Sequence, residues 1–220
     1  MSSVFYRVKH LYQESGLTGL IRDLSAYLHL YVHSTYYVLD VRYPLKEIMD
    51  FKPKITNFTY KMLTKTSELN ELIDNGYNFV LNVRVVRHQL KEGAIGSFIF
   101  VDKELAAISW MATNEKAKNT FDPQPYKVDF AHGEVCVGGD WTNPKYRRLG
   151  LNSYLITQRQ RYNTTRGTAK CRTIVLINNV AELASRDKRR DGTRDTDYTI
   201  GNYHELLGLK FWKETPLKEI

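Results

Sequence analysis

A strand, a basic turn that contains a glycine and a helix follow one another directly, and this order most limits what the chain can fold into. Residues 135–141 form an apolar run typical of a strand, and residues 151–162 have the pattern of an amphipathic helix. The turn between them contains Arg147, Arg148 and Gly150. The first backbone N–H groups of a helix have no partner within it and carry the positive end of the helix dipole. Because glycine lets a ligand approach the backbone closely, the order predicts a phosphate site at the start of the helix.

The spacing Arg147-x-x-Gly150-x-Asn152 resembles the acyl-CoA loop of the GCN5-related N-acetyltransferase (GNAT) superfamily, whose pattern is Arg/Gln-x-x-Gly-x-Gly/Ala. Pro144, three residues before the arginine, is also frequent in that family. Asn152 departs from the pattern, since a small residue is usual there, and its side chain would either crowd the pyrophosphate or donate to it. An ordinary strand-to-helix turn with surface arginines is the alternative interpretation. The resemblance implies acetyl-CoA or another acyl-CoA as co-substrate.

The similarity to this family covers roughly residues 54–215. Two apolar runs around Asp102-Lys103 predict a β-hairpin, followed by a central strand at 133–141. The apolar run 173–177 is typical of a parallel strand buried on both faces. The Asn178-x-x-Ala start of the next helix and the closing segment 204–211 also resemble the family. Together they predict an α/β fold, a GNAT-like mixed central β-sheet flanked by helices, with an N-terminal helical extension.

The remaining patterns predict further strands, helices and loops. Strands are expected at 36–43, 55–63 and 126–130, helices at 66–74 and 79–93, and polar loops at 114–124 and 186–197. The family resemblance also implies a last helix around Tyr203.

Two regions are expected: residues 1–45, an N-terminal amphipathic helical extension with the first strand, and residues 46–220, a GNAT-like acyltransferase domain. The extension carries apolar residues at helical spacing, namely Leu17, Leu20, Ile21, Leu24, Leu28 and Tyr31. Such a stripe packs on the core or on a second subunit, as in a homodimer, or lies on a membrane surface. No apolar run reaches the roughly 18–20 residues that span a bilayer, and the N-terminus lacks a signal-peptide pattern. We expect a cytoplasmic protein, with peripheral membrane contact as the alternative.

The net charge of +8 favours anionic partners, which include CoA phosphates, nucleic acid and anionic membranes. Aspartates interleaved in the charged segment 186–197 argue against nucleic acid. Cys136 and Cys171 are too few for a disulfide framework or a cysteine-rich metal site. His29 and His33 have helical spacing but lack a third ligand, so no metal site is predicted.

The resemblance implies roles for residues around the acyl-CoA. Backbone groups of Asp140, Trp141 and Thr142 would align the pantetheine arm. Asn178 would add a contact from the following strand end. Beside the Arg147 side chain, the backbone N–H groups that would hold the pyrophosphate belong to Arg148, Leu149, Gly150, Leu151 and Asn152.

Acyl transfer to an amine needs a base for the amine and an acid for the leaving thiolate. Glu134 and Asp140, on the central strand, are the candidates for the base. Even-numbered residues from 134 to 140 share one face of the strand unless a bulge near Gly138-Gly139 breaks the alternation. Tyr203 and His204 are the candidates for the acid. A strand start facing solvent (Glu134), a turn-capping carboxylate (Asp140) and simple packing (Tyr203, His204) are the structural alternatives.

These observations predict an acyl-CoA-dependent N-acyltransferase that transfers an acyl group, as an N-acetyltransferase does, directly to a primary amine. Trp110, Trp141 and Tyr126 are candidates to line the amine pocket, or to pack in the core. The alternative functions are a catalytically silent binding module with the same fold and a basic nucleic-acid-binding protein.

Overall fold

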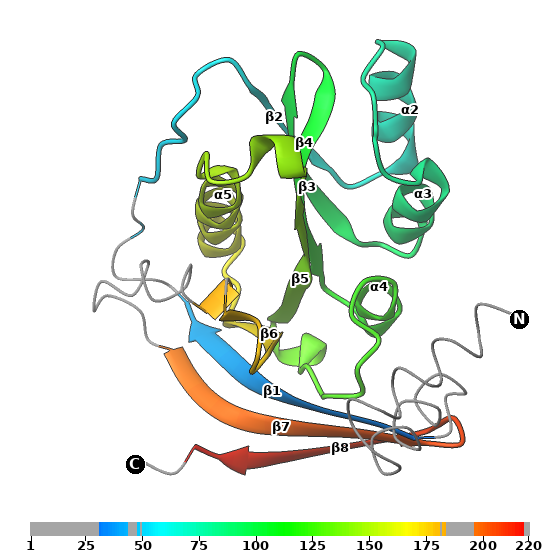
Figure 1. The fold of residues 1–220 in the computed structure, drawn as a ribbon, viewed down its shortest axis with the longest axis vertical. Coiled ribbons are helices and arrows are strands. Elements are labelled where there is room, and N and C mark those ends of the chain that lie inside the picture. The colour runs from blue at the N-terminus through cyan, green and yellow to red at the C-terminus, as the bar shows by residue number, and fades with distance from the viewer. Residues whose placement is uncertain (1–30, 44–47, 49, 181, 184–195, 218–220) are drawn as a thin grey trace, which may run out of the picture.

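The computed structural model describes residues 31–43, 48, 50–180, 182–183 and 196–217. In this part of the chain, eight strands form one mixed sheet in the order β2-β3-β4-β5-β6-β1-β7-β8 (Figure 1). Only β5 and β6 pair in parallel among the described neighbours. The strands are β1 Tyr31–Arg42, β2 Thr59–Leu63, β3 Ile95–Val101, β4 Glu104–Ala112, β5 Glu134–Thr142, β6 Lys170–Leu176, β7 Thr196–Leu206 and β8 Leu209–Pro216.

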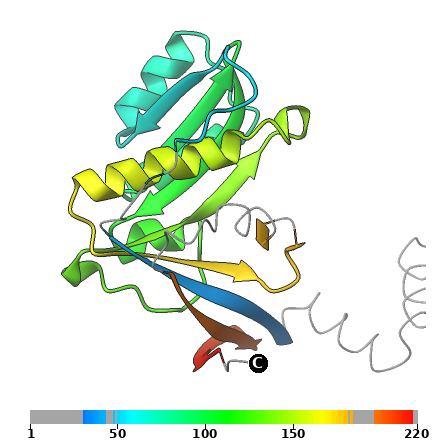
Figure 2. The ribbon, with the colours of Figure 1, turned by 90° about the vertical axis from the view of Figure 1, so that its left-hand side faces the viewer.

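Helices cover both faces of the sheet, which confirms the predicted α/β class. The helices are α2 Thr66–Asp74, α3 Val83–Lys91, α4 Glu115–Asn119 and α5 Leu151–Thr165. Figures 1 and 2 show α2, α3 and α4 on one face and α5 on the other. The core divides accordingly: Phe98 and Trp110 pack toward α2–α4, whereas Ile99 and Ala107 pack against Leu155 of α5.

The β3–β4 hairpin lies at the centre of the fold and was predicted from local pattern. Asp102 and Lys103 both have positive φ, at 49° and 64°, as a two-residue type I′ turn requires. Both strands are buried almost throughout, because helices cover each face. The predicted parallel pairing of the strand after α5 is also confirmed, as β6 pairs with β5.

The first strand is longer than its apolar run and occupies an inner position. β1 pairs antiparallel with β6 on one side and β7 on the other. It begins at Tyr31, so Tyr31 and His33 belong to a strand and not to the predicted helical stripe. The rest of that stripe and His29 lie outside the described residues. The β7 ladder explains the extra length, since residues 31–35 pair with residues 202–206 of β7, whereas the β6 ladder begins only at Tyr36.

Three other predictions are wrong. Segment 114–124 contains α4, capped by the Asn114 side chain, which accepts from Ala117 N at 2.9 Å. Segment 126–130 forms no strand; it leads into a short 3₁₀ helix at Phe130–His132. The implied last helix at Tyr203 is strand β7, because β1 and β8 pair along both of its edges.

Element boundaries also shift at two predicted positions. α3 starts at Val83, later than expected, because the Asn82 side chain accepts from Arg84 N at 3.0 Å and caps it there. β2 begins at residue 59 and not at residue 55. The charged segment lies outside the description up to residue 195, and residues 196–197 belong to β7.

Candidate active site

A β-bulge interrupts β5 at the two glycines. Trp110 of β4 lies opposite Gly138, whereas Ile108 lies opposite Trp141, so Ser109 faces two residues of β5. Gly139 has a φ of +61°, and a Cβ there would lie 3.0 Å from Cδ1 of Trp110. The bulge therefore requires glycine and breaks the alternation of side chains along the strand.

The parallel strands β5 and β6 separate before β5 reaches the bulge. Their pairing covers only Glu134–Cys136 against Lys170–Arg172. Past that point a cavity of about 320 Å³ opens beside them. Gly138 and Gly139 of β5 line this cavity, and residues 121–124, which follow α4, also line it. Its lining includes Tyr36, Phe121, Asp122, Gln124, Gly138, Gly139, Asp140, Ile174 and Asn179.

Asp140, predicted as a base candidate, is fixed by two partners on the α5 side of the sheet. Its Oδ1 accepts from Ser109 Oγ at 2.6 Å and lies 3.4 Å from Nη1 of Arg159. Arg159 Nη1 also donates to Ser109 Oγ. The Asp140 side chain is only 19% exposed although the residue as a whole is exposed. The backbone of the bulge, rather than the carboxylate, therefore faces outward.

Asp122 is a carboxylate at the cavity that the sequence pattern does not reveal, because Asp122-Pro123 lies in a segment whose composition predicts only a polar loop. It is buried and accepts from Tyr126 OH at 2.5 Å. The fully buried Lys118 holds the turn by donating to the carbonyls of Asp122 (3.1 Å) and Gln124 (2.5 Å). Burial raises the pKa of the Asp122 carboxyl above its usual range. A buried carboxyl with a raised pKa at the edge of a cavity is a candidate for proton transfer.

Two further polar side chains line the same cavity. Gln124 Nε2 donates to Tyr36 OH at 3.4 Å. Its amide oxygen is buried and has no hydrogen-bond partner in the described part of the chain, so it could accept from a ligand N–H group. Burial raises the pKa of the Tyr36 phenol, which therefore stays protonated.

The predicted acid candidates lie on β7, and neither lines the cavity. The Tyr203 hydroxyl donates to Glu205, and burial raises the pKa of Tyr203 to about 12. His204 stacks on His33 with ring centroids 4.4 Å apart. These side chains alternate between the two faces of the strand, so they do not act together at one site.

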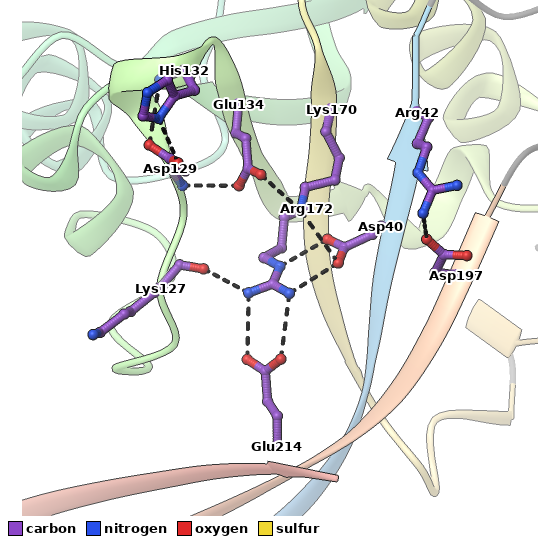
Figure 3. Close-up of polar contacts among 10 residues, drawn as sticks. All are labelled: Asp40, Arg42, Lys127, Asp129, His132, Glu134, Lys170, Arg172, Asp197 and Glu214. Carbon is purple, nitrogen blue, oxygen red and sulfur yellow. Dashed lines mark hydrogen bonds and ion pairs between the residues drawn. The ribbon is translucent and has the colours of Figure 1, made fainter. Parts of the chain in front are cut away.

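Glu134, the other predicted base, also lies outside the cavity lining. Its carboxylate is 2.7 Å from Lys170 Nζ and accepts from Asp129 N at 2.8 Å. Figure 3 shows that it belongs to a group of ion pairs centred on Arg172 and Asp40. The structure thus places Glu134 at the paired end of β5 and Asp140 at the open end.

The basic turn is anchored to the β3–β4 hairpin. Asn143 N donates to Ala106 O at 2.9 Å, and Glu104 accepts from Tyr146 OH and Lys145 Nζ, both at 2.8 Å. The hydrogen bond from the Lys145 ammonium lowers the pKa of the Glu104 carboxyl most, and the hydrogen bond from the Tyr146 hydroxyl lowers it further. This anchor fixes the position of the start of α5 relative to the end of β5.

The loop brings the predicted phosphate-binding residues together. Arg148 and Gly150 have positive φ, at 64° and 82°, and α5 begins at Leu151 without a side-chain cap. Backbone N–H groups that follow left-handed residues form anion-binding concavities. Arg147 and Arg148 are exposed beside them, and Arg147 Nε donates to Thr142 O at 3.3 Å. Phe51 packs on Gly150, where a Cβ would lie 2.6 Å from its Cε1 atom.

The other predicted contacts are distributed around these features. Leu149 O accepts from Lys54 N at 2.9 Å, and the Leu151 side chain is buried against β3 and β4. Asn152 lies in the first turn of α5. Asn178 is exposed just after β6, and the neighbouring Asn179 lines the cavity instead.

The described residues contain no cluster of three or more side chains suited to hold a metal ion. Within the same residues, no helix has the length and apolar character needed to cross a membrane.

No protein-family model matches the chain, and no curated protein matches it. Similar solved structures include a Drosophila protein at 12% identity, with a TM-score of 0.48 over 88% of this chain and 58% of that one. A GCN5-related N-acetyltransferase-like protein of Streptococcus suis is 12% identical, with a TM-score of 0.43 over 91% of this chain and 69% of that one. A GCN5-related N-acetyltransferase of Kribbella flavida is 14% identical, with a TM-score of 0.39 over 73% of this chain and 54% of that one. The chain thus spans less than two thirds of the first of these, and at such values the likeness says nothing of its activity.

Proposed function

We propose that this chain is an acyl-CoA-dependent N-acyltransferase that acetylates a primary amine. The observation that carries the proposal is the continuity of β5. One strand passes from a glycine bulge beside an open cavity into an anchored loop with uncapped N–H groups and two exposed arginines. A thioester site and a phosphate site therefore follow one another along a single segment, as a molecule with a pyrophosphate and a long arm requires.

The residues present fit such a substrate. The pyrophosphate would lie against the N–H groups of residues 148–152, where Arg147 and Arg148 add charge. The pantetheine arm would follow the outward-facing backbone of residues 140–142. The thioester would then lie in the cavity beside the bulge, which Gly138 and Gly139 line. Backbone N–H groups near the bulge would stabilise the oxyanion that develops on the carbonyl.

The reaction needs proton transfer at the attacking amine and at the leaving thiolate. The Asp122 carboxylate takes a proton from the acceptor ammonium, and the Gln124 amide oxygen orients the amine. The amine nitrogen then attacks the thioester carbonyl carbon and forms the C–N bond. Collapse of the tetrahedral intermediate breaks the C–S bond, and the thiolate takes a proton from Tyr36. The new amide nitrogen gives up its second proton, which returns Tyr36 to the phenol. Asp122 and Tyr36 both line the cavity, unlike Glu134, Tyr203 and His204, which remain candidates from sequence alone.

Calorimetric titration with acetyl-CoA tests the binding half of the proposal. Arg147→Ala should weaken binding by about 1.5–3 kcal/mol, the usual contribution of a hydrogen bond to a charged group. Arg166→Ala, at the other end of α5, is the matched control and should leave the affinity unchanged. Absence of binding by acetyl-CoA and by longer acyl-CoAs would refute the proposal.

Steady-state kinetics with an amine screen test the chemical half. Asp122→Asn should lower kcat about 10²–10⁴-fold, the usual contribution of general base catalysis, with the Kd for acetyl-CoA unchanged. Saturable binding without turnover of any amine would instead identify a silent binding module.

A further inference from the structure

A second cavity lies next to the first on the α3 face of the sheet. It has a volume of about 430 Å³ and lies between α3, β4 and the end of β5. Phe121 and Gly139 line both cavities, so the two meet at the bulge. We call this second cavity the α3 groove. Its apolar lining consists mainly of Leu81, Val85, Ile108, Trp110, Phe121 and Trp141.

The α3 groove offers almost no polar group to a ligand. No charged side chain lines it within the described residues, and each of its three polar side chains already makes one hydrogen bond within the protein. Asn82 Oδ1 accepts from Arg84 N, Gln89 Nε2 donates to Thr120 O, and Thr120 Oγ1 donates to Ala117 O. A ligand with several hydroxyl groups would therefore replace few of the hydrogen bonds that it loses to water, whereas an apolar ligand would gain from burial.

The neighbouring cavity supplies what the groove lacks. Asp122 and the unpartnered amide oxygen of Gln124 lie beyond Phe121, on the side where the amine must react. A ligand with an apolar body and one terminal amine matches both parts at once, with the body against the two tryptophans and the amine at the bulge.

Resting on the proposed function, we infer that the acceptor is a primary amine on an apolar, aromatic-sized body, held in the α3 groove. Amino sugars and other polyhydroxylated amines are poor acceptors. The volume lies in the range of small-molecule sites, which are mostly apolar with a few converging polar groups.

The test compares 2-phenylethylamine with glucosamine as acceptors, with acetyl-CoA as donor. The kcat/KM for 2-phenylethylamine should be at least tenfold higher, because apolar contacts of this kind give about 10–200-fold discrimination. Val85→Asn should lower kcat/KM for 2-phenylethylamine about tenfold and leave the Kd for acetyl-CoA unchanged. Val85 is 49% exposed, so the fold should accept the change.

Val80→Asn is the matched control, because Val80 is 45% exposed on the same segment but does not line the groove. It should leave both kcat/KM values unchanged. Equal or better use of glucosamine, or equal effects of the two valine variants, would overturn this inference alone. Failure to bind acetyl-CoA would overturn the proposed function and the inference together.

Discussion

The ion pairs around Arg172 allow a stability prediction that is independent of function. Arg172 of β6 binds Asp40 of β1 through two hydrogen bonds, of 2.8 and 2.9 Å (Figure 3). It also donates to Lys127 O at 2.8 Å and to Glu214 of β8 at 3.3 Å. The Arg172 and Asp40 side chains are only 15% and 13% exposed. One guanidinium thus joins three strands and the linker before β5.

Arg172→Met would leave the Asp40 carboxylate with Lys170, at 3.6 Å, as its one remaining ion-pair partner among the described residues. Loss of one partner of a buried pair costs about 3–5 kcal/mol. Because this group is slightly open to water, we take the lower limit, about 3 kcal/mol. In a chain of this size each kcal/mol lowers the Tm by about 2–4 °C, so the variant should lose roughly 6–12 °C.

The matched control is Arg42→Met on β1. Arg42 pairs with Asp197, but their side chains are 57% and 54% exposed. Exposed pairs contribute about 0–1 kcal/mol, so this variant should lose less than about 4 °C. Circular dichroism melts at pH 7, with urea unfolding for the free energies, measure both. Equal losses in the two variants would refute the reasoning from burial, and Arg172→Lys should recover only part because it lacks the bidentate fork.

Three other expectations follow from burial. Cys136 is fully buried, and burial raises its pKa to about 12, so iodoacetamide should label it only in urea; labelling of the native chain would contradict this. Leu155→Ala should cost about 2–5 kcal/mol, because Leu155 is fully buried between α5 and the sheet, whereas Leu207→Ala at a 70% exposed site should stay within about 0.5 kcal/mol in urea unfolding. Burial raises the pKa of Asp122, so the folded chain holds this proton more tightly than the unfolded chain, and stability falls as pH rises through the raised pKa. The free energy of unfolding of Asp122→Asn minus that of the parent, measured in urea, should therefore be larger at pH 7 than at pH 4. Asp129→Asn should show the opposite sign, because His132 lowers the pKa of Asp129.

The β3–β4 turn and α4 show which elements a local sequence pattern can predict and which it cannot. The type I′ turn at Asp102-Lys103 was predictable because two adjacent residues decide it. α4 was missed although Asn114 caps it, because a five-residue helix has too little periodicity to be recognised. Likewise, the two adjacent glycines Gly138-Gly139 marked where a bulge could form, but that a bulge does form there depends on pairing with β4, about thirty residues earlier in the sequence.

The candidate site divides in the same way. The anion loop of residues 147–152 is one continuous segment, so its members were predictable together. Asp122 and Tyr36 were not, because they are 86 residues apart in sequence and meet only where the linker after α4 packs across the sheet. The separation of Glu134 from the cavity likewise follows from its ion pair with Lys170 on the neighbouring strand.

By itself, the sequence determined the elements whose signals are local: the hairpin, the central strand with its glycines, the basic loop, α5 and the parallel strand β6. The expected burial of β6 on both faces is wrong, since its residues alternate between buried and partly exposed. Tertiary structure alone decided that β1 lies between β6 and β7, that the segment around Tyr203 is a strand, and which carboxylates reach the cavity. The physical reason is that backbone pairing on both edges of a strand outweighs local preference. A cavity forms where segments that are distant in sequence pack with space between them, so no run of adjacent residues predicts it.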